Sequence, residues 1–135
     1  MLSFKIVAIT VAVLLIVLNK LGVLKTTKKI AYVYKHIGNE LTVTYKRFTG
    51  PEFYNFMLGK NSTITISYDV HVEEGELTLE WTERKRLIWR ETFRSDSRGS
   101  FTAQTGHRLH CVKLEGKDTR GGCHVVLAQH KVYDT

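Results

Sequence analysis

Beyond residue 38 the chain alternates apolar and polar residues over short runs, with turn-forming residues between them. The clearest run is residues 62–72, where every second residue is apolar: Ile64, Ile66, Tyr68, Val70 and Val72. Successive side chains of a β-strand point to opposite faces, so this period of two predicts a strand with one buried face. Runs of the same kind predict further strands at residues 41–45, 53–58, 76–81, 87–93 and 100–104.

Glycine, proline and polar residues mark the predicted turns between these strands. They fall at residues 49–51, 59–61, 73–75, 83–86, 95–99 and 115–121. Many short strands with frequent turns are typical of an antiparallel sheet arranged as a sandwich. We therefore expect a mainly β fold, an antiparallel β-sandwich of about seven to eight strands, over residues 39–135. An N-terminal hydrophobic helix is expected to precede it.

The N-terminus has a different pattern, because residues 6–18 form a continuous apolar run without a charge. A membrane-spanning helix needs about 17–25 apolar residues and a signal-peptide core about 7–15, so this run lies between the two. No small-residue cleavage site follows it, which favours an uncleaved transmembrane or signal-anchor helix over residues 1–24. A removed signal peptide and a buried helix are the alternatives. Residues 25–38 are predicted to be a basic juxtamembrane connection, with a helix favoured over an edge strand for residues 26–38.

The net charge of +7 comes entirely from residues 1–60, which hold nine Lys and Arg against two Asp and Glu. Lys20, Lys25, Lys28 and Lys29 follow the apolar run and are expected to meet anionic lipid headgroups. The remaining residues carry both signs equally and no basic stripe, which argues against a nucleic-acid partner. The basic flank favours a cytoplasmic domain, whereas the export-like N-terminus and the two cysteines favour an extracellular one. We expect a single-pass cell-membrane protein with an extracellular C-terminal domain, secreted if the N-terminus is cleaved.

Both cysteines lie in residues 107–126, HRLHCVKLEGKDTRGGCHVV. If residues 115–121 form a hairpin turn, Cys111 lies opposite Cys123 on the core side of the sheet. Directly opposed residues have Cβ atoms about 4.5–5.5 Å apart, close to the separation in a disulfide. The pattern therefore favours a Cys111–Cys123 disulfide, with free buried thiols and a metal site as alternatives.

The same register places His110 opposite His124, on the other face of the hairpin. Two opposed imidazoles are a weak candidate pair for a divalent metal or a response to pH. A zinc site needs cysteine and histidine ligands that converge on one point, and here they point apart. We therefore expect no metal site and no cofactor, with incidental surface histidines as the alternative to a pair.

A second basic group follows the predicted strand at residues 76–81: Arg84, Lys85, Arg86, Arg90 and Arg94. These side chains are candidates for binding an anionic ligand or an acidic partner. Glutamates on neighbouring strands would instead make a charge-balanced sheet face. Trp81 and Trp89 are predicted to be core residues rather than a sugar-stacking platform. Residues 53–58, FYNFML, are apolar on both faces, which indicates either a strand buried on both sides or a contact with another chain.

Four segments resemble a group of small exported or membrane-anchored β-sandwich proteins of Gram-positive bacteria. They are YDVHVEEGELTL at residues 68–79, IWRETF at 88–93, GSF at 99–101 and VKLEGKDTRGGCHV at 112–125. The similarity covers about residues 40–130, and it implies an exported sandwich without supplying any catalytic residue, since that group has no known activity. This chain differs in lacking a lipid-attachment cysteine and in carrying two cysteines near its C-terminal end.

The chain contains no G-x-S-x-G, phosphate-binding loop or H-E-x-x-H motif, so the sequence predicts no enzyme. The leading hypothesis is a membrane-anchored, non-enzymatic extracytoplasmic module for protein–protein interaction or self-assembly, held in lipid through residues 1–24. The alternative is a binding protein for an anionic small molecule or cell-envelope polymer, through the basic surface of residues 84–98.

Overall fold

The computed structural model describes residues 10–14 and 27–130. Residues 10–14 are helical, and neither described segment contains a helix long and apolar enough to cross a membrane. The predicted anchor over residues 1–24 therefore falls mostly outside the described residues. Within residues 27–130 the chain forms seven strands: β1 (Lys28–Ile30), β2 (Val33–Ile37), β3 (Glu40–Met57), β4 (Ser62–Glu83), β5 (Arg86–Phe93), β6 (Ser97–Thr105) and β7 (Leu109–His130).

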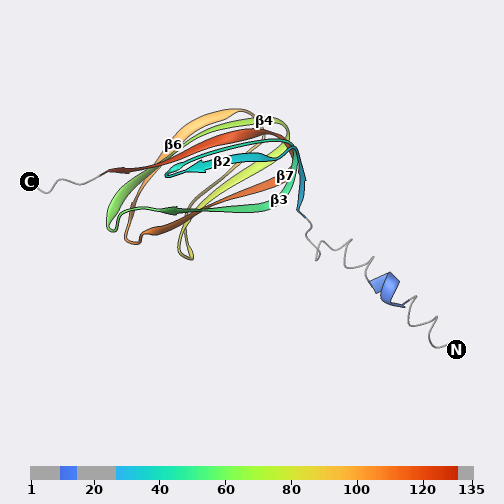
Figure 1. Ribbon diagram of the computed structural model, residues 1–135, viewed down its shortest axis with the longest axis horizontal. Helices are drawn as coiled ribbons and strands as arrows, with labels where there is room; N and C mark the ends of the chain where they lie inside the picture. The colour runs from blue at the N-terminus through green and yellow to red at the C-terminus, as the bar shows by residue number, and fades with distance from the viewer. Residues whose placement is uncertain (1–9, 15–26, 131–135) are drawn as a thin grey trace, which may run out of the picture.

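All seven strands belong to one antiparallel sheet in which the long strands lie in the order β3–β7–β4. Strands β1 and β2 pair with the outer edge of β3, while β5 and β6 pair with different halves of the outer edge of β4. The three long strands bend near their middles, so the sheet folds over itself as a sandwich (Figure 1). We call the half that contains β2 and β6 the β6 layer, and the half that contains β5 the β5 layer.

The bends lie at three of the predicted turns, residues 49–51, 73–75 and 115–121, and those predictions are wrong because the strands continue through them. Shifts of register in the β3–β7 and β4–β7 pairs mark the same places. Gly75 has a φ of 73°, and a Cβ there would collide with the carbonyl oxygens of Lys117 and Asp118. Glycine thus lets the neighbouring strands approach closely where the sheet turns over.

Residues 28–30 and 33–37 form edge strands, so the helix favoured for residues 26–38 is wrong within the described part of that segment. Ala31 breaks the edge into two strands, because its φ of 51° is incompatible with a continuous strand. The edge-strand alternative is confirmed. These residues are part of the sandwich rather than a separate connection.

The core lies between the two layers and consists of the inward apolar residues that the alternation predicted. Its fully buried side chains include Leu41, Ile64, Ile66, Leu79, Trp81 and Leu127. Aromatic contacts join the layers at both lateral edges, with ring centroids 4.5 Å apart for His36–Phe56 and 5.1 Å apart for Tyr68–Trp89. Burial of each large apolar side chain contributes about 1.5–3 kcal/mol, so this shared interior is the main source of stability.

The predicted C-terminal hairpin is also wrong, because β7 is one strand that passes through both layers. Val112 and Leu114 face the core before the bend, whereas Cys123 and Val125 face it afterwards, so the inward positions change from even to odd. Cys111 therefore faces outward in the β5 layer while Cys123 faces inward in the β6 layer. Facing sheets pack about 10 Å apart, which is beyond disulfide range, and both cysteines are free thiols. The predicted disulfide is wrong.

Candidate binding groove

One row of polar residues crosses the outer face of the β6 layer, perpendicular to five strands. Its members are direct neighbours in the sheet, in the order Lys35, Thr42, His124, Asp69 and Arg98. Strands lie about 4.8 Å apart, so four spacings give a track about 19 Å long. Sequence alternation identifies Thr42, Asp69 and His124 as outward-facing, whereas Lys35 and Arg98 fall in a predicted connection and a predicted turn. Only the strand order and register bring the five residues into one row.

Hydrogen bonds hold three members of this row, His124, Asp69 and Arg98, in fixed positions. His124 Nε2 donates to Glu40 Oε1 over 2.7 Å, and Arg98 Nη2 donates to Asp69 Oδ2 over 2.9 Å. Lys35 and Arg98 balance Glu40 and Asp69 in charge. Counted together with the neighbouring Glu40, the row offers both donors and acceptors without a net charge of either sign.

The surface along this row is hollowed. Hollows of about 290 and 400 Å³ share Asp69 and His124 as lining residues, and a smaller one of about 190 Å³ continues from Thr42 to Lys35. The larger two reach the lower range of small-ligand sites. Gly122 lines the depression between Thr44 and His71, and a Cβ there would collide with the carbonyl oxygen of Val43, so the neighbouring strands approach closely at this point. We call this depression, with its polar row, the cross-strand groove.

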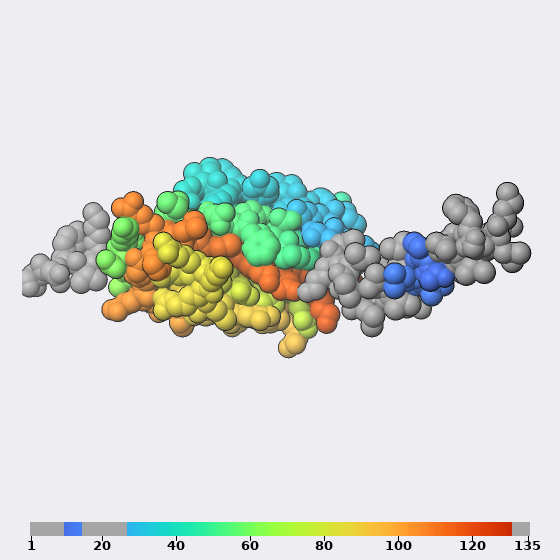
Figure 2. All heavy atoms as spheres, turned by 90° about the horizontal axis from the view of Figure 1, so that it is seen from below, coloured from blue at the N-terminus to red at the C-terminus, as the bar shows by residue number. Residues whose placement is uncertain are grey.

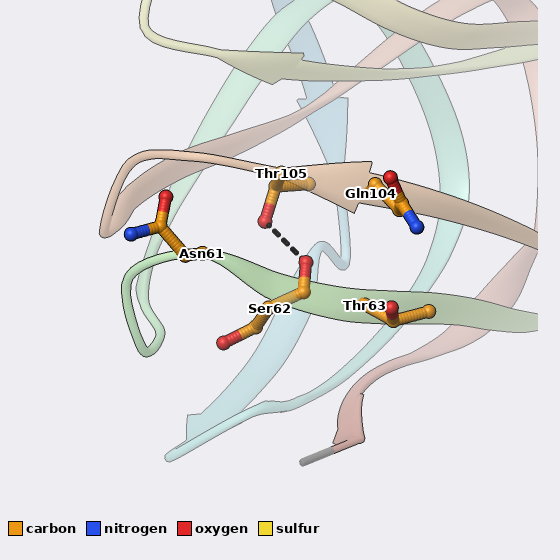
Figure 3. Close-up of a pocket in the computed structure, with 5 residues that line it drawn as sticks. All are labelled: Asn61, Ser62, Thr63, Gln104 and Thr105. Atoms are coloured by element: carbon orange, nitrogen blue, oxygen red, sulfur yellow. Dashed lines mark hydrogen bonds between the residues drawn. The ribbon is translucent and has the colours of Figure 1, made fainter. Parts of the chain in front are cut away.

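A further hollow of about 270 Å³ lies at the end of the same layer, where β4 begins and β6 ends. Figure 3 shows Thr105 opposite Ser62 and Gln104 opposite Thr63 across these two strands. The Thr105 hydroxyl donates to the Ser62 carbonyl oxygen over 3.1 Å. This hollow is confined to the ends of two strands, whereas the row of the cross-strand groove spans five strands.

His71 borders the groove and is arranged as a cation. Its Nδ1 lies 2.8 Å from Asp96 Oδ1 and its Nε2 lies 3.1 Å from Glu73 Oε1. Carboxylates only accept hydrogen bonds, so both ring nitrogens carry protons in this arrangement. The hydrogen bonds to Glu73 and Asp96 raise the pKa of His71 above its ordinary value of 6.5. The Val72 backbone N–H and then His71 lower the pKa of Asp96.

The predicted basic group lies elsewhere, on and beside β5. Arg84 and Lys85 are at the tip of the β4–β5 hairpin, and the remaining arginines face glutamates of β4. The separations are 3.2 Å for Arg86–Glu83, 4.0 Å for Arg90–Glu80 and 2.7 Å for Arg94–Glu76. Arg98 is in the other layer. The structure therefore favours the charge-balanced face that the sequence left as an alternative.

The predicted histidine pair is wrong, because His110 and His124 lie in different layers. His110 is fully buried, accepts a hydrogen bond from Trp81 Nε1 at Nδ1, and donates from Nε2 to the His107 carbonyl. Burial lowers the pKa of His110, which keeps the ring neutral. Among the described residues no three His, Cys, Asp or Glu side chains converge to hold a metal ion.

The tryptophans and the FYNFML segment separate into buried and exposed members. Trp81 is fully buried, as predicted, and Trp89 is half-buried against Tyr68 at the edge of the core. Phe53 and Met57 are 60% and 72% exposed on the outer face of the β5 layer, whereas Tyr54 and Phe56 face the core. Burial on both faces is therefore wrong for this segment, and the contact with another chain stays a prediction.

Comparison with protein-family models and with curated proteins finds no match. Among solved structures, one described as CBM4 has a TM-score of 0.47 and 13% identity, covering 81% of this chain and 83% of its own. A carbohydrate-binding module from Cellvibrio mixtus lichenase 5A, solved with cellotriose, has a TM-score of 0.46 and 12% identity, covering 81% and 92%. A Paenibacillus sp. cycloisomaltooligosaccharide glucanotransferase has a TM-score of 0.43 and 10% identity, covering 76% of this chain and 16% of the enzyme.

Proposed function

We propose that this protein is a non-catalytic binding module whose cross-strand groove holds a carbohydrate chain. The observation that carries the proposal is the row from Lys35 to Arg98, which presents donors and acceptors along a hollowed track across five strands. Each sugar hydroxyl both donates and accepts, so it matches a row in which carboxylate, imidazole, hydroxyl and guanidinium groups follow one another.

Charge and rigidity support a neutral, extended ligand over an anionic one. Arg98 is paired with Asp69, and the nearby Glu40, which accepts from His124, offsets the charge of Lys35, so an anionic polymer gains little net attraction from the groove. Because hydrogen bonds already fix His124 and Arg98, few rotamers are lost when a ligand binds, and less free energy is spent on ordering.

The test is calorimetry of the protein with neutral glucan, xylan and galactan oligosaccharides. Asp69→Ala and His124→Ala are expected to weaken binding about tenfold or more, since hydrogen bonds to charged groups contribute about 1.5–3 kcal/mol. Arg90→Ala is the matched control, because Arg90 is an exposed arginine opposite a glutamate in the other layer. Binding that is lost in the control but kept in the groove variants would support the basic surface of residues 84–98 instead. Absence of binding to every glycan would refute the proposal.

A second candidate function is contact with a protein partner or self-assembly. The outward side chains of Phe53, Met57 and Leu109 favour it, because Met57 and Leu109 are neighbours across β3 and β7 on an apolar area of the β5 layer. Phe53→Ser with Met57→Ser should then reduce assembly in sedimentation velocity without affecting glycan binding. A sedimentation coefficient identical in parent and variant would remove this candidate.

The membrane anchor over residues 1–24 and the extracellular placement remain part of the proposal. Both cysteines are free thiols, so a disulfide no longer favours an extracellular location. The apolar run, and the resemblance of residues 40–130 to exported sandwich proteins, are what support this location. Protease protection of the full chain in intact cells is the direct test. Protection from an added protease would place the domain inside.

A further inference from the structure

The edge of the sandwich formed by β1 and β2 is short but exposes several large apolar side chains. Ile30, Val33, Tyr34 and Ile37 are 56% to 64% exposed and lie within ten residues of each other. Figure 2 shows the residues of this edge, in cyan, as a continuous band along one long side of the molecule. Val33 and Ile37 share one face of β2 while Tyr34 projects from the other, so this edge strand exposes apolar side chains on both of its sides. Isolated exposed apolar residues are ordinary, but several on one edge favour an interaction site.

Positive charge accompanies these apolar side chains. Lys28, Lys29 and Lys35 lie on the same two strands, and the chain has no Asp or Glu before Glu40. Lys29 pairs with Glu52 of β3 and lies 4.9 Å from the centre of the Tyr32 ring. Within residues 27–130, neither Lys28 nor Lys35 forms an ion pair, so both are available to an anionic surface.

The position of this edge in the chain restricts what it meets. Nine residues, 19–27, separate the apolar run from β1. An extended chain spans at most about 3.6 Å per residue, so the start of β1 lies within about 36 Å of the end of that run. If the apolar run enters a bilayer, the β1–β2 edge is the part of the sandwich tethered nearest to it.

We propose that the β1–β2 edge lies against an anionic lipid surface. Its isoleucines and valine enter the boundary between headgroups and acyl chains, where Tyr34 is also favoured, and Lys28 and Lys35 contact lipid phosphates. The cross-strand groove then runs from Lys35 near the membrane to Arg98 away from it. Lys35 and Ile37 also line the end of the groove, and the experiment measures lipid contact with no glycan present, so its outcome is separate from that of the glycan-binding test.

The experiment uses the full chain reconstituted as single copies in nanodiscs of phosphatidylcholine with or without phosphatidylglycerol. A fluorophore is attached through Ile37→Cys in a Cys111→Ser background, where Cys123 is buried and unreactive. The matched control is Leu87→Cys, which is exposed on β5 at the opposite edge of the sheet. Spin-labelled lipids quench a fluorophore that touches them.

We expect at least twofold stronger quenching at position 37 than at position 87 in discs with phosphatidylglycerol. Lys28→Glu with Lys35→Glu should remove that difference while leaving the chain in the disc. Equal quenching at the two positions, or quenching unchanged by the charge reversals, would overturn the proposal. Quenching at position 37 that is weak in single-copy discs and weaker still in discs with two copies would identify a second chain as the occupant instead, because that chain would shield the fluorophore from lipid.

Discussion

At the scale of single residues, His110 links the core to pH. Its two hydrogen bonds, from Trp81 and to the His107 carbonyl, require a neutral ring protonated on Nε2. Burial lowers the pKa of His110 in the folded state, whereas in the unfolded chain it returns to about 6.5. Below that pH the unfolded chain therefore binds the proton more strongly, and folding stability decreases.

We expect His110→Phe to flatten the loss of stability between pH 6.5 and 5, measured by urea unfolding. The variant should also lose about 1–3 kcal/mol at pH 7.5, because the Trp81 N–H is left buried without an acceptor. His71 acts in the opposite direction. Because the pKa of His71 is raised in the folded state, its contribution to folding stability is complete below about pH 6.5. That contribution is lost as the pH rises through the pKa of His71 in the folded protein. His71→Gln is therefore the control. If His110→Phe lost as much stability between pH 6.5 and 5 as the parent protein does, His110 would not be the source of that loss.

The two thiols differ in environment although they lie on one strand. Burial raises the pKa of Cys123 to about 12 and also raises that of the half-buried Cys111. Thiolate is the reactive form, so we expect Ellman's reagent to modify Cys111 slowly and Cys123 only after unfolding. Intact mass should be the same with and without reductant. A native mass lower by two hydrogens would contradict the free thiols.

At the scale of elements, the sequence predicted most strands and faces, since alternation determines which side chains point inward. It could not distinguish a bend from a turn. Glycine and polar side chains suited to either a bend or a turn occur at residues 49–51, 73–75 and 115–121. Only the pairing of the long strands with one another makes each strand continue through these residues. The groove was missed for the same reason, because Lys35 and Arg98 share a row through register rather than spacing.

The bend at Gly75 should be intolerant of any side chain. Gly75→Ala introduces a Cβ at a φ of 73° and against the carbonyls of Lys117 and Asp118. Gly38→Ala is the matched control, because Gly38 has a φ of 58° but nothing within 4 Å of the added carbon. We expect a loss of about 1–2 kcal/mol in the control from backbone strain alone and a clearly larger loss in Gly75→Ala, by chemical denaturation. Equal losses would show that the bend can relax.

At the scale of the molecule, the two layers are not independent units. Each of β3, β4 and β7 contributes to both, and the core between them is shared. Trp81 and Trp89 both lie in the β5 layer, so tryptophan fluorescence reports that layer while far-ultraviolet circular dichroism reports both. We expect the two signals to give one coincident unfolding transition. A fluorescence midpoint separate from the dichroism midpoint would indicate layers that unfold singly.

The continuous strands also determine where this sequence can change length during evolution. An added residue in the β4–β5 or β3–β4 connection lengthens a loop at the surface and leaves every pairing intact. An added residue at a bend shifts one half of a strand against both of its neighbours, and each inward side chain beyond it moves to the outer face. Insertions and deletions in homologous chains should therefore collect in the hairpin loops. The number of residues at each of the three bends should stay constant.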